Sequence, residues 1–238
     1  MHETVIFPET LAACERRGRG LHIFTEFDPS RCVHVDIDMQ NGFVEPDGIV
    51  SVPAARGVIN NINRISRAVR ASGGSNIFTR WLVQDPNTAV WPGLYEQNLQ
   101  IDSLREAFSH GSIQFELSDK LDLVVEDRVI DKTRFSAFIP GSSDLEDILR
   151  EAGAEILIVT GTVTNVCCES TVRDAMQMGY KVIVAYDAMA AFTDEIHNRA
   201  INAMAGLFAD VVDTDQLLQS LENNVLRPAA SAQLIDRD

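Results

Sequence analysis

Residues 155–186, EILIVTGTVTNVCCESTVRDAMQMGYKVIVAY, contain one complete unit of the predicted fold. The stretch begins with a short apolar run over Glu155–Thr160, continues with an amphipathic segment over Val166–Met178, and closes with a second apolar run over Lys181–Tyr186. Short, nearly continuous apolar runs are typical of strands that are buried on both faces, and the segment between them has a helical period. We therefore predict a strand, a helix and a parallel strand.

The same alternation extends in both directions along the chain. The predicted strands are Val33–Asp38, Asn76–Trp81, Arg128–Lys132, Glu155–Thr160, Lys181–Tyr186 and Asp210–Asp213. The predicted helices between and after them are Ala54–Ala71, Asp144–Glu151, Val166–Met178, Asp194–Phe208 and Gln216–Leu221. Six apolar strands separated by helices specify a parallel sheet that is covered on both faces. We therefore predict an α/β protein with a three-layer α/β/α architecture and a doubly wound, six-stranded parallel sheet of Rossmann-like type.

Two segments fall outside this alternation. Residues 1–32 carry a helix signal between Pro8 and Gly18, and then lead into the first strand. Residues 82–125 separate the second and third strands and include a predicted helix over Ser103–Phe108. A connection of this length is usually a lid or a binding loop. The predicted organisation is an N-terminal extension over 1–32, one domain over 33–223 that contains the 82–125 insertion, and a C-terminal tail over 224–238.

The composition excludes several classes of partner. The chain has 238 residues, with 20 Lys and Arg against 35 Asp and Glu, and a formal charge of −15. This acidic balance excludes nucleic acid and anionic membranes as partners. No apolar run approaches the ~20 residues that cross a bilayer, and the start MHETVIFPET has no secretory signal pattern. We therefore expect a cytoplasmic protein. Its four cysteines are expected to be reduced, since the adjacent Cys167 and Cys168 cannot form an ordinary disulfide with each other.

Three residues with reactive side chains lie at the carboxyl ends of predicted strands. Asp38 ends the first strand, Lys132 ends the third, and Cys167 opens the helix after the fourth. In an open parallel sheet, ligands bind outside the carboxyl ends of the strands. We therefore expect these three side chains to meet at one edge of the sheet.

Cys167 has a physical reason to be a nucleophile. Asn165 is a good N-cap residue, which would place Cys167 in the first helical turn, near backbone N–H groups and the positive end of the helix dipole. Both features lower a cysteine pKa, and the N–H groups can hold an oxyanion. A cysteine beside a sheet is more often a core residue, and this is our interpretation of Cys168, which points about 100° away along the helix.

Asp38 and Lys132 form a second predicted pair. An ammonium group keeps a neighbouring carboxylate ionised, and that carboxylate can take a thiol proton and return it to a leaving amine. The alternative is a buried structural ion pair without chemistry. The nearby thiol favours the catalytic interpretation.

The segments VDIDMQNGF (35–43), DKTRFSAF (131–138) and GTVTNVCCESTVRDA (161–175) resemble three signatures of the isochorismatase-like cysteine hydrolases. Their order and spacing match from about Val33 to Val212. The resemblance implies Cys167 as nucleophile, Asp38 as base and Lys132 as the third catalytic residue. It also implies a cis peptide between Thr162 and Val163, with the N–H groups of Val163 and Cys167 as oxyanion hole. The ureidoacrylate and N-carbamoyl amidohydrolase branch has the most similar pattern.

The chain also departs from the family pattern. His34 and Asp36 occupy first-strand positions that are usually aliphatic, so they need polar partners. Metal-dependent nicotinamidases of the family carry an Asp and two His after the second strand, whereas FTRWLVQDPNTAVWPG (78–93) contains no histidine. We therefore predict no metal and no other cofactor. Members that cleave isochorismate lack the cysteine, so Cys167 favours cleavage of a C–N bond over a vinyl ether.

The substrate pocket is predicted to be apolar, aromatic and supplied with one cation for a carboxylate. The predicted lining residues are Phe43, Arg80, Trp81, Tyr95, Phe138 and Thr162.

The predicted function is metal-independent cysteine hydrolysis of a small amide, ureido or carbamoyl substrate through a thioester. One alternative is a Mg²⁺-dependent phosphatase of the haloacid-dehalogenase type, since Asp36-Ile-Asp38 resembles its nucleophile motif, with Thr160 and Lys132 as phosphate contacts. The order of Thr160 and Lys132 counts against it. The same fold also accommodates an isochorismatase-type vinyl-ether hydrolase or a non-catalytic binding protein.

We also predict a homo-oligomer, either a dimer or a tetramer. Related hydrolases often assemble in this way, and residues 82–125 add apolar surface that one domain does not fully cover. Residues 82–100 are expected near the pocket mouth, and residues 1–32 at a subunit boundary.

Overall fold

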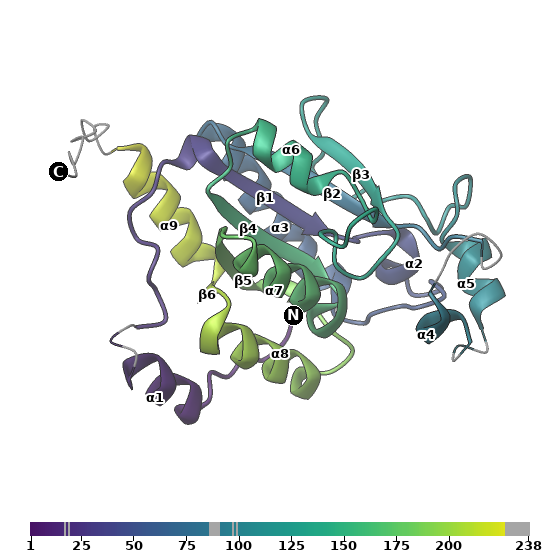
Figure 1. The fold of residues 1–238 in the computed structure, drawn as a ribbon, viewed down its shortest axis with the longest axis horizontal. Coiled ribbons are helices and arrows are strands. Elements are labelled where there is room, and N and C mark those ends of the chain that lie inside the picture. Colours follow the sequence, from purple (N-terminus) through teal and green to yellow (C-terminus); the bar gives the residue numbers. More distant parts are fainter. Residues whose placement is uncertain (17, 19, 86–90, 97, 99, 227–238) are drawn as a thin grey trace.

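The fold is a six-stranded parallel sheet with helices on both faces (Figure 1), which confirms the predicted doubly wound architecture. The computed structural model describes residues 1–238 except 17, 19, 86–90, 97, 99 and 227–238. The strands are β1 (Cys32–Ile37), β2 (Ser75–Trp81), β3 (Arg128–Lys132), β4 (Ile156–Thr162), β5 (Lys181–Ala190) and β6 (Asp210–Val212). Each neighbouring pair is parallel, and their order is β3-β2-β1-β4-β5-β6.

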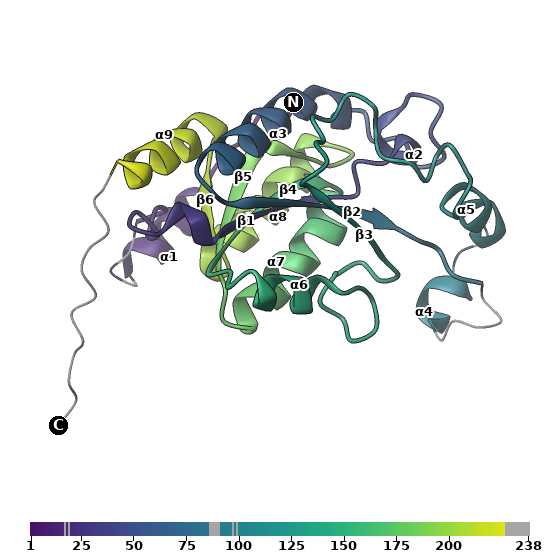
Figure 2. The ribbon, with the colours of Figure 1, turned by 90° about the horizontal axis from the view of Figure 1, so that it is seen from above.

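The helices form the two outer layers. Figure 2 shows α3 (Ala55–Ala71) and α9 (Thr214–Val225) on one side of the sheet, and α6 (Leu145–Glu151) and α7 (Glu169–Gln177) on the other. Helix α8 (Asp194–Leu207) packs against α7 and β6 on this second side. The buried apolar side chains accordingly divide into two clusters, one under α3 and α9 and one under α6, α7 and α8.

The sequence explains why α3 forms and where α9 begins. The buried side chains of α3 include Val58, Ile62, Ile65 and Val69, whose spacing of three or four residues gives one apolar stripe. Helix α9 begins earlier than predicted because Asp213 forms a capping box at its N-terminus.

Strands β1 and β4 are neighbours at the point where the strand order reverses. In doubly wound sheets this switch point is the usual ligand site. Gly161 in β4 has a φ of 104°, and a Cβ atom there would overlap the backbone of Ile37 in β1. Only glycine permits this close approach of the two strands beside the site.

The long connection between β2 and β3 lies beyond the carboxyl end of β1. It contains the short helix α4 (Pro92–Tyr95) and the helix α5 (Ile101–Ala107), which replaces the predicted helix over Ser103–Phe108. Figures 1 and 2 show α5 near α2 (Asn41–Val44), which follows β1. Part of the predicted lid, residues 86–90, 97 and 99, lies outside the described residues. Within the described part of the chain, no helix has the length and apolar character needed to span a membrane.

The described part of the N-terminal extension packs onto its own chain. Its helix α1 (Pro8–Arg16) contacts α8. The backbone N–H groups of Val5 and Phe7 donate to the side chains of Asn198 and Asn202, which lie one turn apart on α8. A short 3₁₀ turn, η1 (Pro29–Arg31), then leads into β1. The predicted subunit boundary at residues 1–32 stays a prediction.

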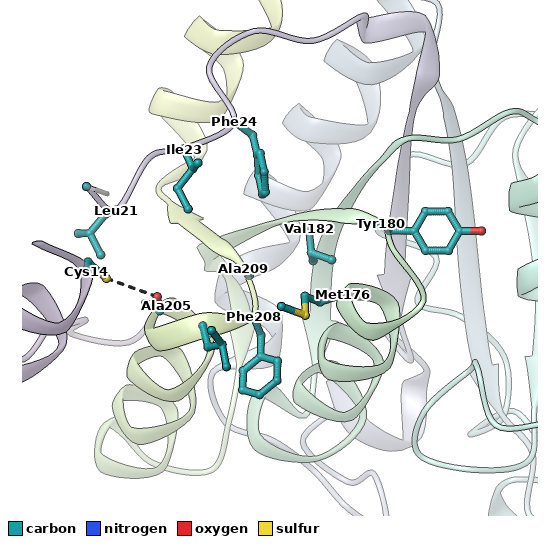
Figure 3. Close-up of a pocket in the computed structure, with 12 residues that line it drawn as sticks. Cys14, Leu21, Ile23, Phe24, Met176, Tyr180, Val182, Ala205, Phe208 and Ala209 are labelled. Atoms are coloured by element: carbon teal, nitrogen blue, oxygen red, sulfur yellow. Dashed lines mark hydrogen bonds between the residues drawn. The ribbon is translucent and has the colours of Figure 1, made fainter. Parts of the chain in front are cut away.

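A cavity of about 460 Å³ lies between the extension and the layer formed by α7 and α8 (Figure 3). Its lining is mostly apolar and includes Leu21, Phe24, Met176 and Phe208. The Cys14 thiol contributes to the same wall and lies 3.5 Å from the carbonyl oxygen of Ala205. None of its lining residues belongs to the set predicted to be catalytic.

Candidate active site

The structure brings Asp38 and Lys132 into direct contact. The Lys132 Nζ atom lies 2.7 Å from Asp38 Oδ2, and both side chains are 0% exposed. Asp38 directly follows β1 in a left-handed backbone conformation with a φ of 52°. Thr79 of β2 orients its carboxylate, because the Thr79 hydroxyl donates to Asp38 Oδ1 at 2.8 Å. The Lys132 ammonium also donates to the carbonyl oxygen of Arg134 at 3.0 Å.

The Cys167 thiol completes this cluster. Side-chain hydrogen bonds connect it to both Asp38 and Lys132, and the residue is only 3% exposed. Cys167 lies in a single π-helical turn, η2 (Thr164–Cys168), between the end of β4 and the start of α7. The three side chains that the sequence predicts at one edge of the sheet therefore do meet there.

The local structure around Cys167 differs from the prediction. Val163, not Asn165, is the residue that precedes the turn, and no side chain caps it. The α-helix itself begins only at Glu169. The extra residue of a π turn leaves no signature in the hydrophobic period, so the sequence indicated an ordinary helix start.

The predicted low pKa of Cys167 is wrong. Burial raises the pKa of the Cys167 thiol to about 12, although the nearby Lys132 ammonium opposes this shift. Burial acts against the charge of Lys132 as well, yet the attraction of Asp38 and Cys167 outweighs it, and the pKa of Lys132 is raised. The resting site therefore holds a neutral thiol beside an ion pair, and its nucleophile needs a base.

Cys168 is a core residue, as predicted. Its side chain is 0% exposed, and its Sγ atom lies 3.8 Å from the carbonyl oxygen of Thr160. Burial raises the pKa of Cys168 well above its ordinary value.

The backbone before Cys167 has the expected special geometry. The peptide bond between Thr162 and Val163 is cis. The hydroxyl of Thr162 donates to the carbonyl oxygen of Ala190 at 3.2 Å, which ties the end of β4 to β5. The hydroxyl of Thr164 lies 3.0 Å from Nδ1 of the buried His197 in α8. The turn that carries Cys167 is thus fixed from two neighbouring elements.

Several predicted pocket residues form one aromatic cluster. The Phe43 and Trp81 ring centroids are 6.2 Å apart, and Trp81 lies 6.0 Å from Phe135, which directly follows the 132–134 segment. Trp91 packs on Phe135 at 4.9 Å and on Tyr95 at 6.3 Å, so α4 and the residue before it cover this cluster.

Two predicted pocket residues lie elsewhere. Arg80 precedes Trp81 on β2, and successive side chains of a strand point to opposite faces. Its guanidinium pairs with Asp131 at 2.8 Å and Glu116 at 3.0 Å, so it is committed to partners other than a substrate. Phe138 packs against Tyr180 at 5.9 Å in the cluster under α6 and α7.

The sequence patterns did not indicate Thr79, Gln40 or Arg134. Gln40 clamps the end of β2, because its side chain accepts from the Trp81 N–H at 2.7 Å and donates to the Phe115 carbonyl at 2.8 Å. The Arg134 guanidinium lies over the Trp91 ring at 4.9 Å and supplies a cation at the aromatic cluster. For Thr79, the available signal was its polar side chain within the predicted strand Asn76–Trp81.

The described residues offer no cluster of side chains that fits a metal ion. In the described part of the chain, no group of three or more His, Cys, Asp or Glu side chains is arranged to hold one. Residues 78–93, which include the end of β2 and the start of the connection after it, contain no histidine. No step below is assigned to a metal.

The chain belongs to the isochorismatase family, since the Isochorismatase domain matches residues 32–216. It is therefore a hydrolase of that family, and the haloacid-dehalogenase alternative is wrong. Among the proteins that it resembles, Nicotinamidase 3 of Arabidopsis thaliana is 29% identical over 188 residues, which cover 79% of this chain and 87% of that protein.

Solved structures agree with this assignment. A cysteine hydrolase from Pseudomonas syringae pv. phaseolicola 1448A has a TM-score of 0.75 and 28% identity, and the match covers 83% of this chain and 95% of that one. N-carbamoylsarcosine amidase from Thermoplasma acidophilum has a TM-score of 0.63, 23% identity, and coverage of 78% and 97%. At this identity the second likeness shows the shared fold alone.

Proposed function

We propose that this protein is a metal-independent cysteine amidohydrolase that cleaves a C–N bond of a small amide, ureido or carbamoyl compound. The observation that carries the proposal is the buried contact between the Cys167 thiol and the Asp38–Lys132 ion pair. Nicotinamidase 3 among the similar proteins supports this substrate class by its name.

Acylation uses Asp38 first as a base and then as an acid. Its carboxylate takes the thiol proton as Cys167 Sγ bonds to the substrate carbonyl carbon, and the carbonyl π electrons move onto oxygen. We assign the backbone N–H groups of Val163 and Cys167 to this oxyanion. When the oxyanion collapses, the C–N bond breaks, and Asp38 returns the proton to the leaving nitrogen. A thioester on Cys167 remains.

Deacylation repeats the same proton path with water. Asp38 takes a proton from the water as its oxygen bonds to the thioester carbon. The C–S bond then breaks, the proton passes from Asp38 to Cys167 Sγ, and the acid product leaves. Lys132 stays protonated throughout, since the pKa of its ammonium is raised. It keeps Asp38 oriented and offsets the negative charge as that charge moves from the carboxylate to sulfur.

The surroundings of the cluster favour a small, flat substrate. Asp38, Lys132 and Cys167 are nearly inaccessible to solvent, so bulky chains are excluded. The aromatic cluster that contains Trp81 gives one wall. The Trp81 indole N–H is buried and has no hydrogen-bond partner among the described residues, so it can donate to a substrate oxygen or nitrogen. Thr162 and Tyr95 stay candidates for substrate contact.

A panel of primary amides, ureido acids and carbamates, assayed for ammonia release, tests this proposal. The expected result is turnover of at least one class in excess EDTA, lost in Cys167→Ala. Turnover of a vinyl ether without any C–N hydrolysis would replace the proposal with the isochorismatase-type reaction. We also propose, on the family resemblance, a cytoplasmic homo-oligomer.

A further inference from the structure

Two buried polar side chains of β1 have no part in the mechanism above. His34 and Asp36 are both 0% exposed, on a strand whose other residues are apolar or Cys32. His34 faces α3, since its Nδ1 atom lies 3.3 Å from the Ser66 hydroxyl. Asp36 precedes Asp38 by two residues and is electrostatically coupled to it. A buried ionisable group persists only where partners compensate its desolvation.

Thr160 of β4 connects these two side chains. Its Oγ1 atom lies 2.7 Å from Asp36 Oδ1 and 2.7 Å from His34 Nε2. On the other side of the imidazole, Nδ1 lies 3.0 Å from Asn76 Oδ1. The Asn76 amide nitrogen donates to Ser66 O and to Asp127 Oδ1, so its oxygen faces His34 as an acceptor. One continuous hydrogen-bonded chain therefore runs from Asn76 to Asp36.

Counting donors shows that this chain can hold one proton in either of two places. Because Asn76 accepts, His34 Nδ1 carries a hydrogen in both arrangements. When the Thr160 hydroxyl donates to Asp36, Nε2 must also carry a hydrogen, and an imidazolium faces a carboxylate. When Asp36 carries the proton, the hydroxyl turns to donate to Nε2, and both groups are neutral. The heavy atoms need not move between these arrangements.

The surroundings favour the neutral arrangement over the imidazolium–carboxylate one, and above about neutral pH Asp36 loses its proton to solvent. Burial raises the pKa of Asp36 to about 7, with the Thr160 hydrogen bond opposing the shift and the charge of Asp38 adding to it. Burial lowers the pKa of His34 to about 4. The second oxygen, Asp36 Oδ2, has no hydrogen-bond partner among the described residues, as suits an uncharged carboxyl.

We propose that Asp36 is a positioning residue that tunes the basicity of Asp38, and that Thr160 and His34 are its proton relay. The inference rests on the proposed role of Asp38 as the base. Among the described residues of the site, a protonated Asp36 leaves Asp38 as the only carboxylate. An ionised Asp36 repels the charge of Asp38 and so raises the affinity of Asp38 for the proton of Cys167.

The relay step balances without any further reactant. The Asp36 O–H bond and the Thr160 O–H bond break, while a new Thr160 O–H bond and a His34 Nε2–H bond form. The products are a carboxylate and an imidazolium, so the net charge of the relay is unchanged. This transfer can occur when Asp38 takes the thiol proton, because the loss of its negative charge makes an ionised Asp36 less unfavourable.

Among the described residues, few other charged or titratable groups lie around the relay. Arg70 of α3 pairs with Asp127 at 2.6 Å at the Asn76 end of the chain. Lys132 lies beyond Asp38 and is paired with it. Cys168 is coupled to Asp36 but stays neutral, since burial raises the pKa of its thiol. Asp36 therefore remains the group of the relay whose pKa lies at neutral pH.

Alkylation of Cys167 by iodoacetamide, followed against pH in the resting enzyme, tests the inference without a substrate. Because any thiol below its pKa is alkylated faster as the pH rises, each rate is first corrected for this common increase in thiolate. The corrected rate of the wild type is expected to show an additional rise of about tenfold across neutral pH, for a coupling of about one pKa unit. Asp36→Asn, which is neutral at every pH, is expected to lack this additional rise. Asp210→Asn changes a carboxyl of β6 that is also buried and is expected to leave the rise unchanged.

Thr160→Val is the second variant, and it removes the hydroxyl but keeps the shape. Because the Thr160 hydrogen bond lowers the pKa of Asp36, its loss should move the rise to higher pH. Carboxyl ¹³C NMR of the wild type should show an aspartate resonance that titrates near neutral pH and is missing in Asp36→Asn. Because this resonance is measured in the wild type, its titration tests the inference even if a variant fails to fold.

An additional rise that survives in Asp36→Asn, or an Asp36 resonance that stays ionised into the acid range, overturns the inference. Failure of the proposed function looks different. In that case the substrate panel is not hydrolysed, or Cys167→Ala retains turnover, while the titration of Asp36 is still observed.

Discussion

Replacing Lys132 with methionine tests the buried ion pair that holds the site together. Methionine keeps the length of the side chain but removes its charge, which leaves the Asp38 carboxylate buried without a cation. At the 2.7 Å separation of Nζ and Oδ2, and an effective dielectric constant of about 20, the lost attraction is about 6 kcal/mol. Removal of one partner from a buried pair usually costs about 3–5 kcal/mol. We expect Lys132→Met to lose about 3–5 kcal/mol of unfolding free energy at neutral pH.

The pH dependence of this loss of unfolding free energy follows from the direction of the pKa shifts. The pKa of Lys132 is raised in the folded state, so its contribution to stability is present below its unfolded pKa of about 10.4. That contribution is lost as the pH rises through the folded value. In Lys132→Met the unpaired Asp38 prefers to be protonated, so the destabilisation should shrink as the pH falls toward the unfolded carboxyl pKa of about 3.9.

Urea unfolding of a double-mutant cycle measures both effects. Asp38→Asn combined with Lys132→Met removes both charges and should recover most of the lost stability. Lys120→Met is the matched control, because Lys120 pairs with Glu45 at 2.6 Å on the surface, and it should cost about 1 kcal/mol or less. A cost of Lys132→Met no larger than that of the control, with no coupling to Asp38→Asn, would refute the reasoning.

Three further predictions concern catalysis, recognition and assembly. Asp38→Asn should lower kcat by about 10²-fold or more while substrate affinity is retained, since it removes the proton shuttle. Steady-state kinetics and equilibrium binding check this prediction, and near-normal turnover would contradict it. Trp81→Phe removes the indole N–H but keeps an aromatic ring. KM should therefore rise by about tenfold, the effect of one lost hydrogen bond. An unchanged KM would show that Trp81 does not donate a hydrogen bond to the substrate. Light scattering at micromolar concentration should show a dimer or tetramer, and a fully active monomer would remove the assembly prediction.

The fold was predictable because each strand carries its own signal. All residues of β1 and β4 are buried, and both read as short runs between turn residues. The end of β5 was not predictable in the same way. The strand continues to Ala190 through Tyr186 and Asp187, and the register of β4 and β5 shifts between Val159 and Gly161. Such an irregularity depends on the pairing of two strands, so the sequence of either strand alone does not predict it.

The candidate site was predictable where it depends on topology. Asp38, Lys132 and Cys167 end or follow parallel strands, so their meeting follows from the fold. The role of Thr79 depends on strand register, since Thr79 pairs with Ile37, the residue before Asp38. The pKa of Cys167 depends on burial, which outweighs the helix terminus that the sequence suggested. Local sequence patterns report neither strand register nor the burial of a side chain.

His34 and Asp36 illustrate the remaining gap. Their polarity in an apolar strand predicts that partners exist, because unpaired burial is costly. The partners themselves come from β2, β4 and α3, between 32 and 126 residues away. Only the folded arrangement shows that these partners join the two side chains into one chain of hydrogen bonds.

The most direct test of the central claim is mass spectrometry of the enzyme quenched during turnover of a substrate from the amide panel. We predict an acyl adduct on the peptide that contains Cys167, formed by the wild type and by Cys168→Ala, and missing in Cys167→Ala. An adduct that persists in Cys167→Ala and disappears in Cys168→Ala would contradict the account.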